Sequence, residues 1–281
     1  MHRELTVGVL FIVLGTGVLH AAWNAITKSF DDRMMVFAWM GVTMMAISGV
    51  SLAVTGFPPL VAVWFALASA VVHVAYDFSL MRTYRLGAFN QVYPIARGTS
   101  PLVVALGAAI FAHEHLRALP LAGVVVLAVG LVGLAASAGH LGRSDTPAVA
   151  AAVLTGLMIA SYSLVDGLGV RHSPDPFAYM GLLFLFESPP FVLLGLRRPR
   201  AEWTRDNIAS RSLVAGVIMV AAYWAILWAQ TRAPLAEVSA LRETGVISAA
   251  LIGALLFKER FGLRRIGAAV VVALGIVLIG L

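Results

Sequence analysis

Residues 93–114 read YPIARGTSPLVVALGAAIFAHE, and residues 238–259 read VSALRETGVISAALIGALLFKE. Each stretch holds one arginine, Arg97 or Arg242, inside an otherwise apolar run. A single offset of 145 residues (242 minus 97) places Arg97 on Arg242, Thr99 on Thr244, Leu106 on Leu251 and Glu114 on Glu259. Because arginine is rare within long apolar runs, this match predicts an internal repeat.

A second offset extends the repeat toward the start of the chain. Shifting by 140 residues (177 minus 37) places FAWM at residues 37–40 on FAYM at residues 177–180. The predicted halves are residues 1–140 and 141–281, each with five membrane spans. Because five is odd, the second half enters the membrane in the opposite sense, and we expect an inverted repeat whose halves meet at the bilayer midplane.

The composition indicates a membrane protein. The chain has 281 residues, of which 60% are hydrophobic and only 12% charged, whereas soluble domains carry about 25% charged residues. About 20 apolar residues span a bilayer as a helix. We therefore predict an all-α integral membrane protein with ten transmembrane helices, near residues 6–28, 34–55, 59–82, 87–111, 118–139, 147–169, 176–196, 209–231, 235–257 and 263–281.

Several other classes are excluded. The absence of cysteine rules out disulfides, thiolate metal sites and cysteine nucleophiles. The net charge of +6 comes from basic residues in loops that flank the apolar runs, so membrane topology explains it and no nucleic-acid partner is expected. No G-x-S-x-G or H-E-x-x-H motif occurs, which argues against an enzyme. His113 and His115 are two residues apart and point apart on a helix, so we expect no metal and no cofactor.

The repeat endings Phe111-Ala112-His113-Glu114 and Leu256-Phe257-Lys258-Glu259-Arg260 resemble the EamA-type drug/metabolite transporter superfamily, and the resemblance covers the whole chain. The string His20-Ala21-Ala22-Trp23-Asn24 resembles a subgroup that includes members associated with phosphonate catabolism. The resemblance implies a basket of ten helices around a central cavity, lined by the first, third, fourth, sixth, eighth and ninth spans. It also implies a multi-pass permease that works by secondary transport, and we expect it in a bacterial inner membrane, among membrane lipids.

Arg97 and Arg242 are the leading substrate-binding candidates. A charge at the membrane centre costs from about 3 to over 10 kcal/mol, so each arginine needs a partner or a wet cavity. Two guanidiniums can hold a carboxylate, phosphate or phosphonate through paired hydrogen bonds. In the resemblance, sugar-phosphate members hold phosphate with basic residues on these same two spans. The alternative is that each arginine neutralises a nearby acid: Glu243, Glu187 or Asp77.

Two prolines and a glycine surround Arg97 in the fourth span, at Pro94, Gly98 and Pro101. Broken helices line substrate sites in transporters, so this pattern predicts an interrupted helix. An ordinary proline kink is the alternative.

Polar stripes at helical spacing suggest a hydrogen-bonding cavity with aromatic walls. The predicted substrate-binding residues besides the arginines are Trp23, Asn24, Tyr76, Tyr93, Thr99, Tyr162 and Trp224. Four ionisable residues are candidates for coupling transport to a proton: Asp77, Asp166, Glu187 and His20. Hydrogen bonds between helices are the alternative role for such side chains.

Three substrate classes remain open. The paired arginines favour a small anionic or zwitterionic metabolite. The many aromatic and carboxylate side chains fit an organic cation such as choline instead, held by cation–π contacts. A lipid-linked flippase subunit is the third possibility, since the superfamily contains such components.

Basic residues also predict the orientation. With Arg97 and Arg242 set aside as buried, the connections 1–2, 3–4, 5–6, 7–8 and 9–10 hold 14 of the other 18 lysines and arginines. Cytoplasmic loops carry the excess of basic residues, which places both termini outside the cytoplasm.

Overall fold

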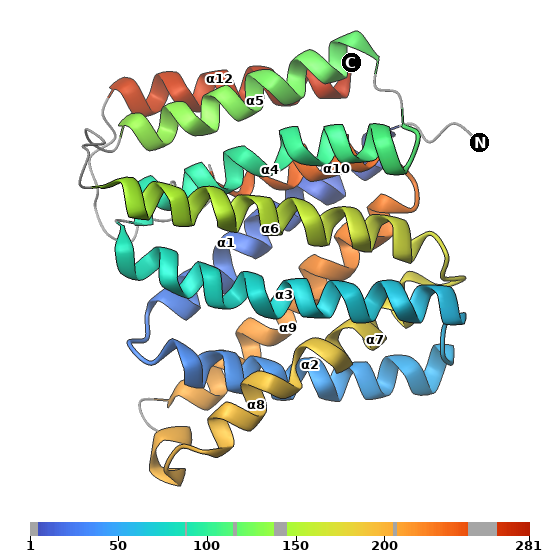
Figure 1. Cartoon of the computed structure of the whole chain (residues 1–281), viewed down its shortest axis with the longest axis vertical. Coiled ribbons are helices and arrows are strands. Elements are labelled where there is room, and N and C mark those ends of the chain that lie inside the picture. Colours follow the sequence, from blue (N-terminus) through green and yellow to red (C-terminus); the bar gives the residue numbers. More distant parts are fainter. Residues whose placement is uncertain (1–4, 88, 115–116, 138–144, 205–206, 247–262) are drawn as a thin grey trace.

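The structure is a computed structural model of the chain, and it describes residues 5–87, 89–114, 117–137, 145–204, 207–246 and 263–281. These residues form helices joined by short connections (Figure 1). The α-helices are α1 (Val7–Lys28), α2 (Arg33–Thr55), α3 (Leu60–Leu86), α4 (Phe89–Phe111), α5 (Ala118–Ser137), α6 (Thr146–Val170), α7 (Pro176–Glu187), α8 (Pro189–Leu196), α9 (Ile208–Gln230), α10 (Leu235–Arg242) and α12 (Leu263–Gly280).

Side-chain caps explain where several helices begin. The Thr6 hydroxyl accepts a hydrogen bond from the Val9 amide at the start of α1, and the Asp32 carboxylate accepts one from the Met35 amide at the start of α2. Such caps satisfy backbone donors that have no partner inside the helix. The predicted span boundaries therefore lie close to the observed helix ends.

Among the described residues, eight segments are long and apolar enough to cross a membrane, counting α7 and α8 together as Pro176–Leu196. The chain is therefore an all-α, multi-pass membrane protein. The predicted ninth span begins with the eight residues of α10, and its remainder, including Leu251 and Glu259 of the repeat, lies outside the described residues. At the predicted tenth span, α12 has a shorter apolar stretch, Ile266–Gly280.

The predicted interruption of the fourth span is wrong, because α4 is continuous and contains both Pro94 and Pro101. Pro101 has no N–H to donate to the carbonyl oxygen of Arg97, four residues earlier. The Ser100 hydroxyl donates to that oxygen instead, at 3.4 Å. The seventh span breaks where the sequence reads Ser188-Pro189-Pro190, between α7 and α8.

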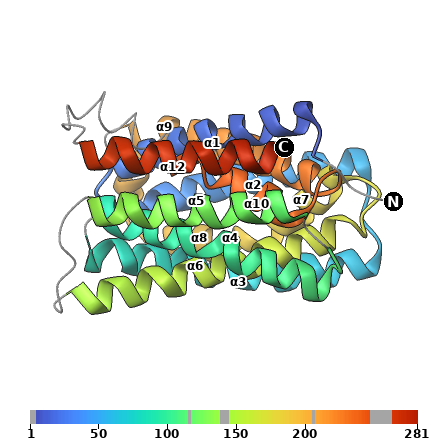
Figure 2. The same cartoon turned by 90° about the horizontal axis from the view of Figure 1, so that it is seen from above.

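Most helices run side by side along one direction, while α1 and α9 cross them obliquely (Figures 1 and 2). The contacting pairs include α5 with α12, α3 and α4 with α6, α1 with α9, and α2 with α7 and α9. At the α5–α12 contact, a Cβ on Gly123 would lie 2.8 Å from the Gly275 carbonyl oxygen, so only a small residue permits this approach.

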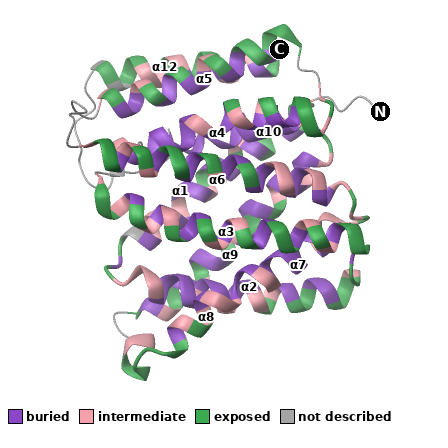
Figure 3. Ribbon diagram, viewed as in Figure 1, coloured by how far each residue is buried: buried purple, intermediate pink, exposed green. Residues whose placement is uncertain are grey.

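Buried residues face the middle of the bundle, and exposed ones cover its outer side (Figure 3). Many of the outer side chains are large and apolar, among them Phe11, Val54, Trp64 and Val129. Soluble proteins rarely expose continuous apolar surface on this scale. The outer face therefore suits a lipid environment, and the polar side chains that matter for function lie inside.

Candidate functional site

Arg97 and Arg242 share one carboxylate, that of Glu243. The Arg97 Nη1 donates to Glu243 Oε2 at 3.0 Å. The Arg242 Nε and Nη2 donate to Glu243 Oε1 at 3.3 and 3.2 Å. All three side chains are buried, and Glu243 has no exposed surface. We call these residues the arginine cluster; it carries two positive charges and one negative charge.

Local backbone geometry brings the cluster together. Helix α10 ends at Arg242, and Glu243 follows as its C-terminal cap. Two residues later the backbone of Gly245 meets that of Gly17 on α1, where a Cβ on Gly17 would lie 3.0 Å from the Gly245 nitrogen. Any larger residue at either position would push the backbones apart. This crossing holds α1, with His20 one turn further on, against the end of α10.

Helix α6 contributes the next contacts of the arginine cluster. The Ser163 hydroxyl accepts a hydrogen bond from Arg242 Nη2 at 3.0 Å. The Arg242 guanidinium also lies over the Tyr162 ring, 5.5 Å from its centroid. On α4, the Arg97 guanidinium lies over the Tyr93 ring at 5.2 Å. Both rings are therefore engaged by cations that belong to the protein itself.

A second buried group, the aspartate cluster, surrounds Asp166 on α6. Its Oδ1 accepts a hydrogen bond from the Tyr179 hydroxyl at 2.9 Å, and its Oδ2 accepts one from the Tyr223 hydroxyl. The His73 Nε2 lies 4.0 Å from Oδ2 and 3.1 Å from the Tyr223 oxygen. These four residues come from α3, α6, α7 and α9, so four helices meet at one carboxylate.

Tyr162 connects the two clusters. Its ring stacks on the His73 ring with centroids 3.9 Å apart, and it meets the Tyr76 ring edge-on at 5.3 Å. The same ring receives the Arg242 guanidinium. The other His73 nitrogen, Nδ1, lies 3.0 Å from the Ser69 carbonyl oxygen, which fixes the imidazole orientation.

Two further carboxylates lie near the aspartate cluster. Glu187, at the end of α7, is within electrostatic reach of Asp77 and Asp166. Its Oε2 is buried and has no hydrogen-bond partner within the described part of the chain. The predicted proton-coupling residues Asp77, Asp166 and Glu187 are therefore neighbours. His20 lies apart from them, within reach of Arg97 and Arg242.

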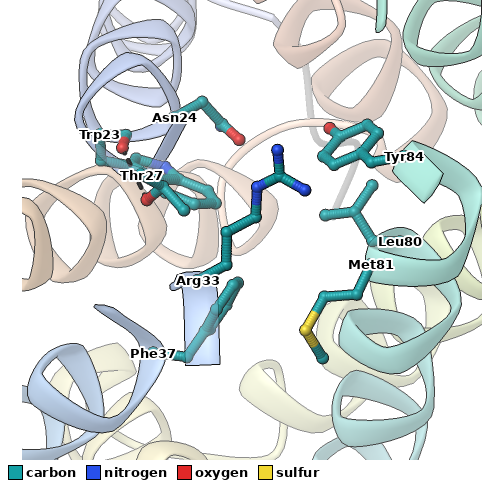
Figure 4. A pocket seen from close by; sticks show the side chains of 8 residues that line it. All are labelled: Trp23, Asn24, Thr27, Arg33, Phe37, Leu80, Met81 and Tyr84. Carbon is teal, nitrogen blue, oxygen red and sulfur yellow. Dashed lines mark hydrogen bonds between the residues drawn. The ribbon is translucent and has the colours of Figure 1, made fainter. Parts of the chain in front are cut away.

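A cavity lies at the end of the bundle where α1 and α3 end and α2 begins, and Figure 4 shows the side chains that line it. It holds about 550 Å³ of empty space, including the part open to solvent. Its lining residues are Trp23, Asn24, Thr27, Arg33, Phe37, Leu80, Met81 and Tyr84. Two predicted binding residues, Trp23 and Asn24, thus line one cavity. Arg33 falls in the predicted loop between the spans 6–28 and 34–55, and no binding role was predicted for it.

Glu114 lies at the opposite end of α4. Its Oε1 forms a 2.7 Å ion pair with Arg171 Nη1, and its Oε2 accepts a hydrogen bond from the Leu235 amide at 2.7 Å. Arg171 also donates to the carbonyl oxygens of Gln230 and Ala233, at 2.9 and 3.0 Å. Glu114 is thus a structural charge that meets a basic residue and the start of α10. We call this contact the Glu114 junction.

Two predicted binding residues are not brought to the clusters. The Trp224 side chain is 37% exposed and packs edge-on against Phe177. Adjacent residues of a helix point about 100° apart, so with Tyr223 facing inward Trp224 faces away. Thr99 donates to the Ile95 carbonyl oxygen of its own helix at 2.8 Å. Neither side chain contacts the two clusters within the described parts of the chain, and their binding roles stay predictions.

Two residues that contact the charged clusters were not predicted from the sequence. Tyr179 and Ser163 contact the charged groups, and both stand on the inward face of a span that the sequence did predict. Helical spacing was the available signal, because Ser163 follows Tyr162 and lies three residues before Asp166. Among the residues that the structure describes, no group of three potential metal ligands occurs.

Comparison with known proteins agrees with the fold and with the resemblance seen in the sequence. Residues 146–281 match the EamA-like transporter family. No curated protein matches the chain. Among solved structures, 29 chains match. One of them, described as "Crystal structure of protein", is 15% identical, covers 96% of this chain and 94% of its own, and superposes with a TM-score of 0.76. At that identity the likeness shows the fold alone.

Proposed function

We propose that this chain is a secondary transporter working by alternating access, in keeping with the match of residues 146–281 to the EamA-like transporter family. Its substrate is a small polar metabolite that carries a carboxylate, phosphate or phosphonate. The observation that carries this proposal is the buried arginine cluster, which holds one more positive than negative charge.

Packing supports two inverted repeats, residues 1–140 and 141–281, with ten spans in all. Exchanging the halves turns α1 into α6, α2 into α7 and α8, α3 into α9, α4 into α10 and α5 into α12. Under this exchange the α3–α6 contact becomes α9–α1, α4–α6 becomes α10–α1, and α2–α9 becomes α7–α3, and all of these pairs are in contact. The pairs α2–α7, α4–α10 and α5–α12 map onto themselves and are also in contact.

The arginine cluster has hydrogen-bond capacity left for an anion. A guanidinium has five N–H donors, more than the contacts with Glu243 and Ser163 use. An incoming oxyanion can therefore share the two arginines with Glu243. It also balances the excess positive charge, which is costly to leave uncompensated away from water.

The nearby aspartate cluster favours a zwitterion. Asp166 and the Arg242 partner Ser163 lie on the same helix, three residues apart, and Tyr162 touches both clusters. A substrate with its acidic group toward Arg242 and an amino group toward Asp166 matches both ends of this arrangement.

The cation alternative has weaker support. The Tyr93 and Tyr162 rings already face guanidiniums, so a choline-like cation would have to displace an arginine from each ring. For the flippase alternative, a shallow groove lies between α2 and α9. It is lined by Val42, Thr43, Ala46, Ile47, Leu213, Val214, Val217 and Ile218. It suits a membrane lipid chain, but none of the charged clusters lies along it.

Alternating access fits the difference between the two ends of the bundle. The Glu114 junction ties helix ends together at one end, whereas the cavity around Arg33 lies at the other. The arginine-rich connections lie at the cavity end, so by the charge count the cavity faces the cytoplasm.

Flux into proteoliposomes of purified protein tests the proposal. The panel contains glycine, aminomethylphosphonate, inorganic phosphate and choline, each as a labelled compound. We expect flux of a zwitterion or anion, and competition among compounds that carry an acidic group. Flux of choline alone would establish the cation alternative and refute the proposal.

We also propose that a proton shared near Asp77 and Glu187 couples transport. Its support is the buried Glu187 oxygen without a partner, close to other carboxylates. An imposed pH gradient should accelerate flux, and Asp77→Asn should abolish that response while Asp31→Asn, at an exposed position, keeps it. Unchanged flux after the gradient is collapsed would argue for a uniporter or another coupling ion.

A further inference from the structure

Arg33 stands at the first turn of α2 and projects into the cavity between Trp23, Asn24 and Tyr84 (Figure 4). Across the described parts of the chain, no ion pair involves Arg33. The neighbouring carboxylate of Asp32 is engaged elsewhere, by Arg198 at 3.2 Å and by the Met35 amide. The cavity therefore holds a cation whose charge is not balanced locally.

Trp23 supplies an independent sign of a missing ligand. Its side chain lines the same cavity and is only 5% exposed, yet its Nε1 is buried and has no hydrogen-bond partner among the residues that the structure describes. An indole nitrogen can only donate, and buried donors are nearly always paired. An acceptor oxygen placed between this N–H and the Arg33 guanidinium would satisfy both groups.

Asn24 lies beside these two donors. Its Nδ2 donates to the His20 carbonyl oxygen of its own helix at 2.8 Å, and its amide oxygen points toward the Arg33 guanidinium (Figure 4). This oxygen carries no full charge, so it does not neutralise the guanidinium. Trp23 on α1 and Arg33 on α2 thus offer donors and a positive charge to one cavity, as a bound oxyanion requires.

We propose that Arg33 and Trp23 form an outer anion site, which receives the carboxylate, phosphate or phosphonate group of the substrate before it reaches the arginine cluster. The proposal rests on the transport function and adds a second binding step to it. The ligand is a soluble oxyanion that enters from the end of the bundle where α2 begins.

The outer anion site leads toward the arginine cluster. Tyr84 is within electrostatic reach of both Arg33 and Arg97. On α1, the Trp23 ring meets the His20 ring edge-on, with centroids 6.0 Å apart, and His20 is within reach of Arg97. Positive charges therefore lie both at the outer anion site and at the arginine cluster, and the charge of the arginine cluster draws an anion inward.

Phosphate binding to the purified full-length chain in detergent tests the site directly. Inorganic phosphate is titrated calorimetrically into wild type, Arg33→Gln and Trp23→Phe. We expect Arg33→Gln to weaken phosphate binding about tenfold or more, since it removes charged hydrogen bonds, and Trp23→Phe to weaken it less. The matched control is Arg82→Gln, which removes an exposed charge next to the cavity residue Met81 and should leave binding unchanged.

Wild-type phosphate affinity in a folded Arg33→Gln protein would overturn the proposal. This arm needs no transported substrate, so it stands or falls separately from the transport function. In proteoliposomes, Arg33→Gln should raise the KM for substrate that enters from the cavity end and leave the KM from the other end unchanged. Equal KM changes at both ends would mean a merely structural role and would refute the outer site.

A lipid phosphate is the other source of this chemistry. The phosphate titration is therefore repeated in nanodiscs of phosphatidylcholine and of phosphatidylglycerol. We expect equal phosphate affinity in both. Competition by phosphatidylglycerol that disappears in Arg33→Gln would assign the site to a lipid headgroup and refute its role in substrate entry.

Discussion

The arginine cluster and the aspartate cluster both hold charge in the buried core of the bundle, but different contacts stabilise that charge. In the first, Arg97 and Arg242 are balanced by the opposite charge of Glu243. In the second, the Asp166 carboxylate is held by the hydroxyls of Tyr179 and Tyr223. Opposite full charges therefore balance one another in the arginine cluster, whereas hydroxyl dipoles stabilise the carboxylate of the aspartate cluster.

The difference predicts how each cluster responds to damage. Removing one ion from a set of buried ions leaves its partners uncompensated. Removing the Asp166 charge leaves two tyrosine hydroxyls, which can turn to other acceptors, and the His73 imidazole, which can be neutral. The arginine cluster should therefore be the more fragile of the two.

Glu243→Gln should have the largest effect. It leaves two buried guanidiniums without a counterion, and we expect it to lower the free energy of unfolding by about 3 to 5 kcal/mol. The matched control is Glu202→Gln, which breaks a partly exposed ion pair with Arg198 and should cost about 1 kcal/mol or less. Chemical denaturation in detergent measures both. Equal losses in the two variants would show that Glu243 is not the counterion of the arginines.

Asp166→Asn should be the next most damaging change. It keeps the shape of the side chain but removes the charge and one acceptor, so the hydrogen bonds from Tyr179 and Tyr223 weaken, at a cost of about 3 kcal/mol or less. The same denaturation experiment measures it. A larger loss than that of Glu243→Gln would reverse the comparison between the clusters.

Arg97→Lys and Arg242→Lys test binding rather than folding. Lysine keeps the positive charge opposite Glu243 but lacks the planar fork, so the proteins should fold and substrate binding should weaken by about 1.5 to 3 kcal/mol. Melting temperature and substrate affinity are measured on the same samples. Folded variants with wild-type affinity would exclude the arginines from the substrate site and favour an aromatic cage.

Trp224→Phe should have the smallest effect. Trp224 lies on the outer side of α9, apart from both clusters, so substrate affinity should stay within about twofold of wild type. The reference is Trp23→Phe, which removes a donor inside the cavity. A strong loss of affinity in Trp224→Phe alone would mean that α9 turns this side chain inward in the substrate-bound state.

Much of the fold could be predicted from the sequence, because bilayer thickness fixes the length of apolar runs. The interruption predicted in α4 failed because Ser100 replaces the backbone donor that Pro101 lacks. The break in the seventh span could have been predicted from Pro189-Pro190, since proline favours the first positions of a new helix. Local sequence thus shows where a helix can bend, and the side-chain donors nearby decide whether it breaks.

The candidate site was predictable in its residue types but not in its pairings. Deep arginines and carboxylates stand out in an apolar sequence, and both the arginine pair and its alternative partner Glu243 could be named. The Glu243 carboxylate accepts a hydrogen bond from Arg97, 146 positions away. This pairing depends on how α10 ends against α1. The cavity lined by Arg33 was missed because the residue lies at a helix start, where loop and cavity wall look alike in sequence.

The Glu114 junction has a consequence for the speed of transport. Arg171 and Glu114 hold the ends of α4, α6 and α9 and the first amide of α10 through contacts that share two side chains. Opening this end of the bundle requires these contacts to break together, in one concerted step. Under the alternating-access mechanism that we propose, this concerted step limits the turnover number. The Glu114 junction, which is remote from the proposed substrate site, would then control the rate of the transport cycle.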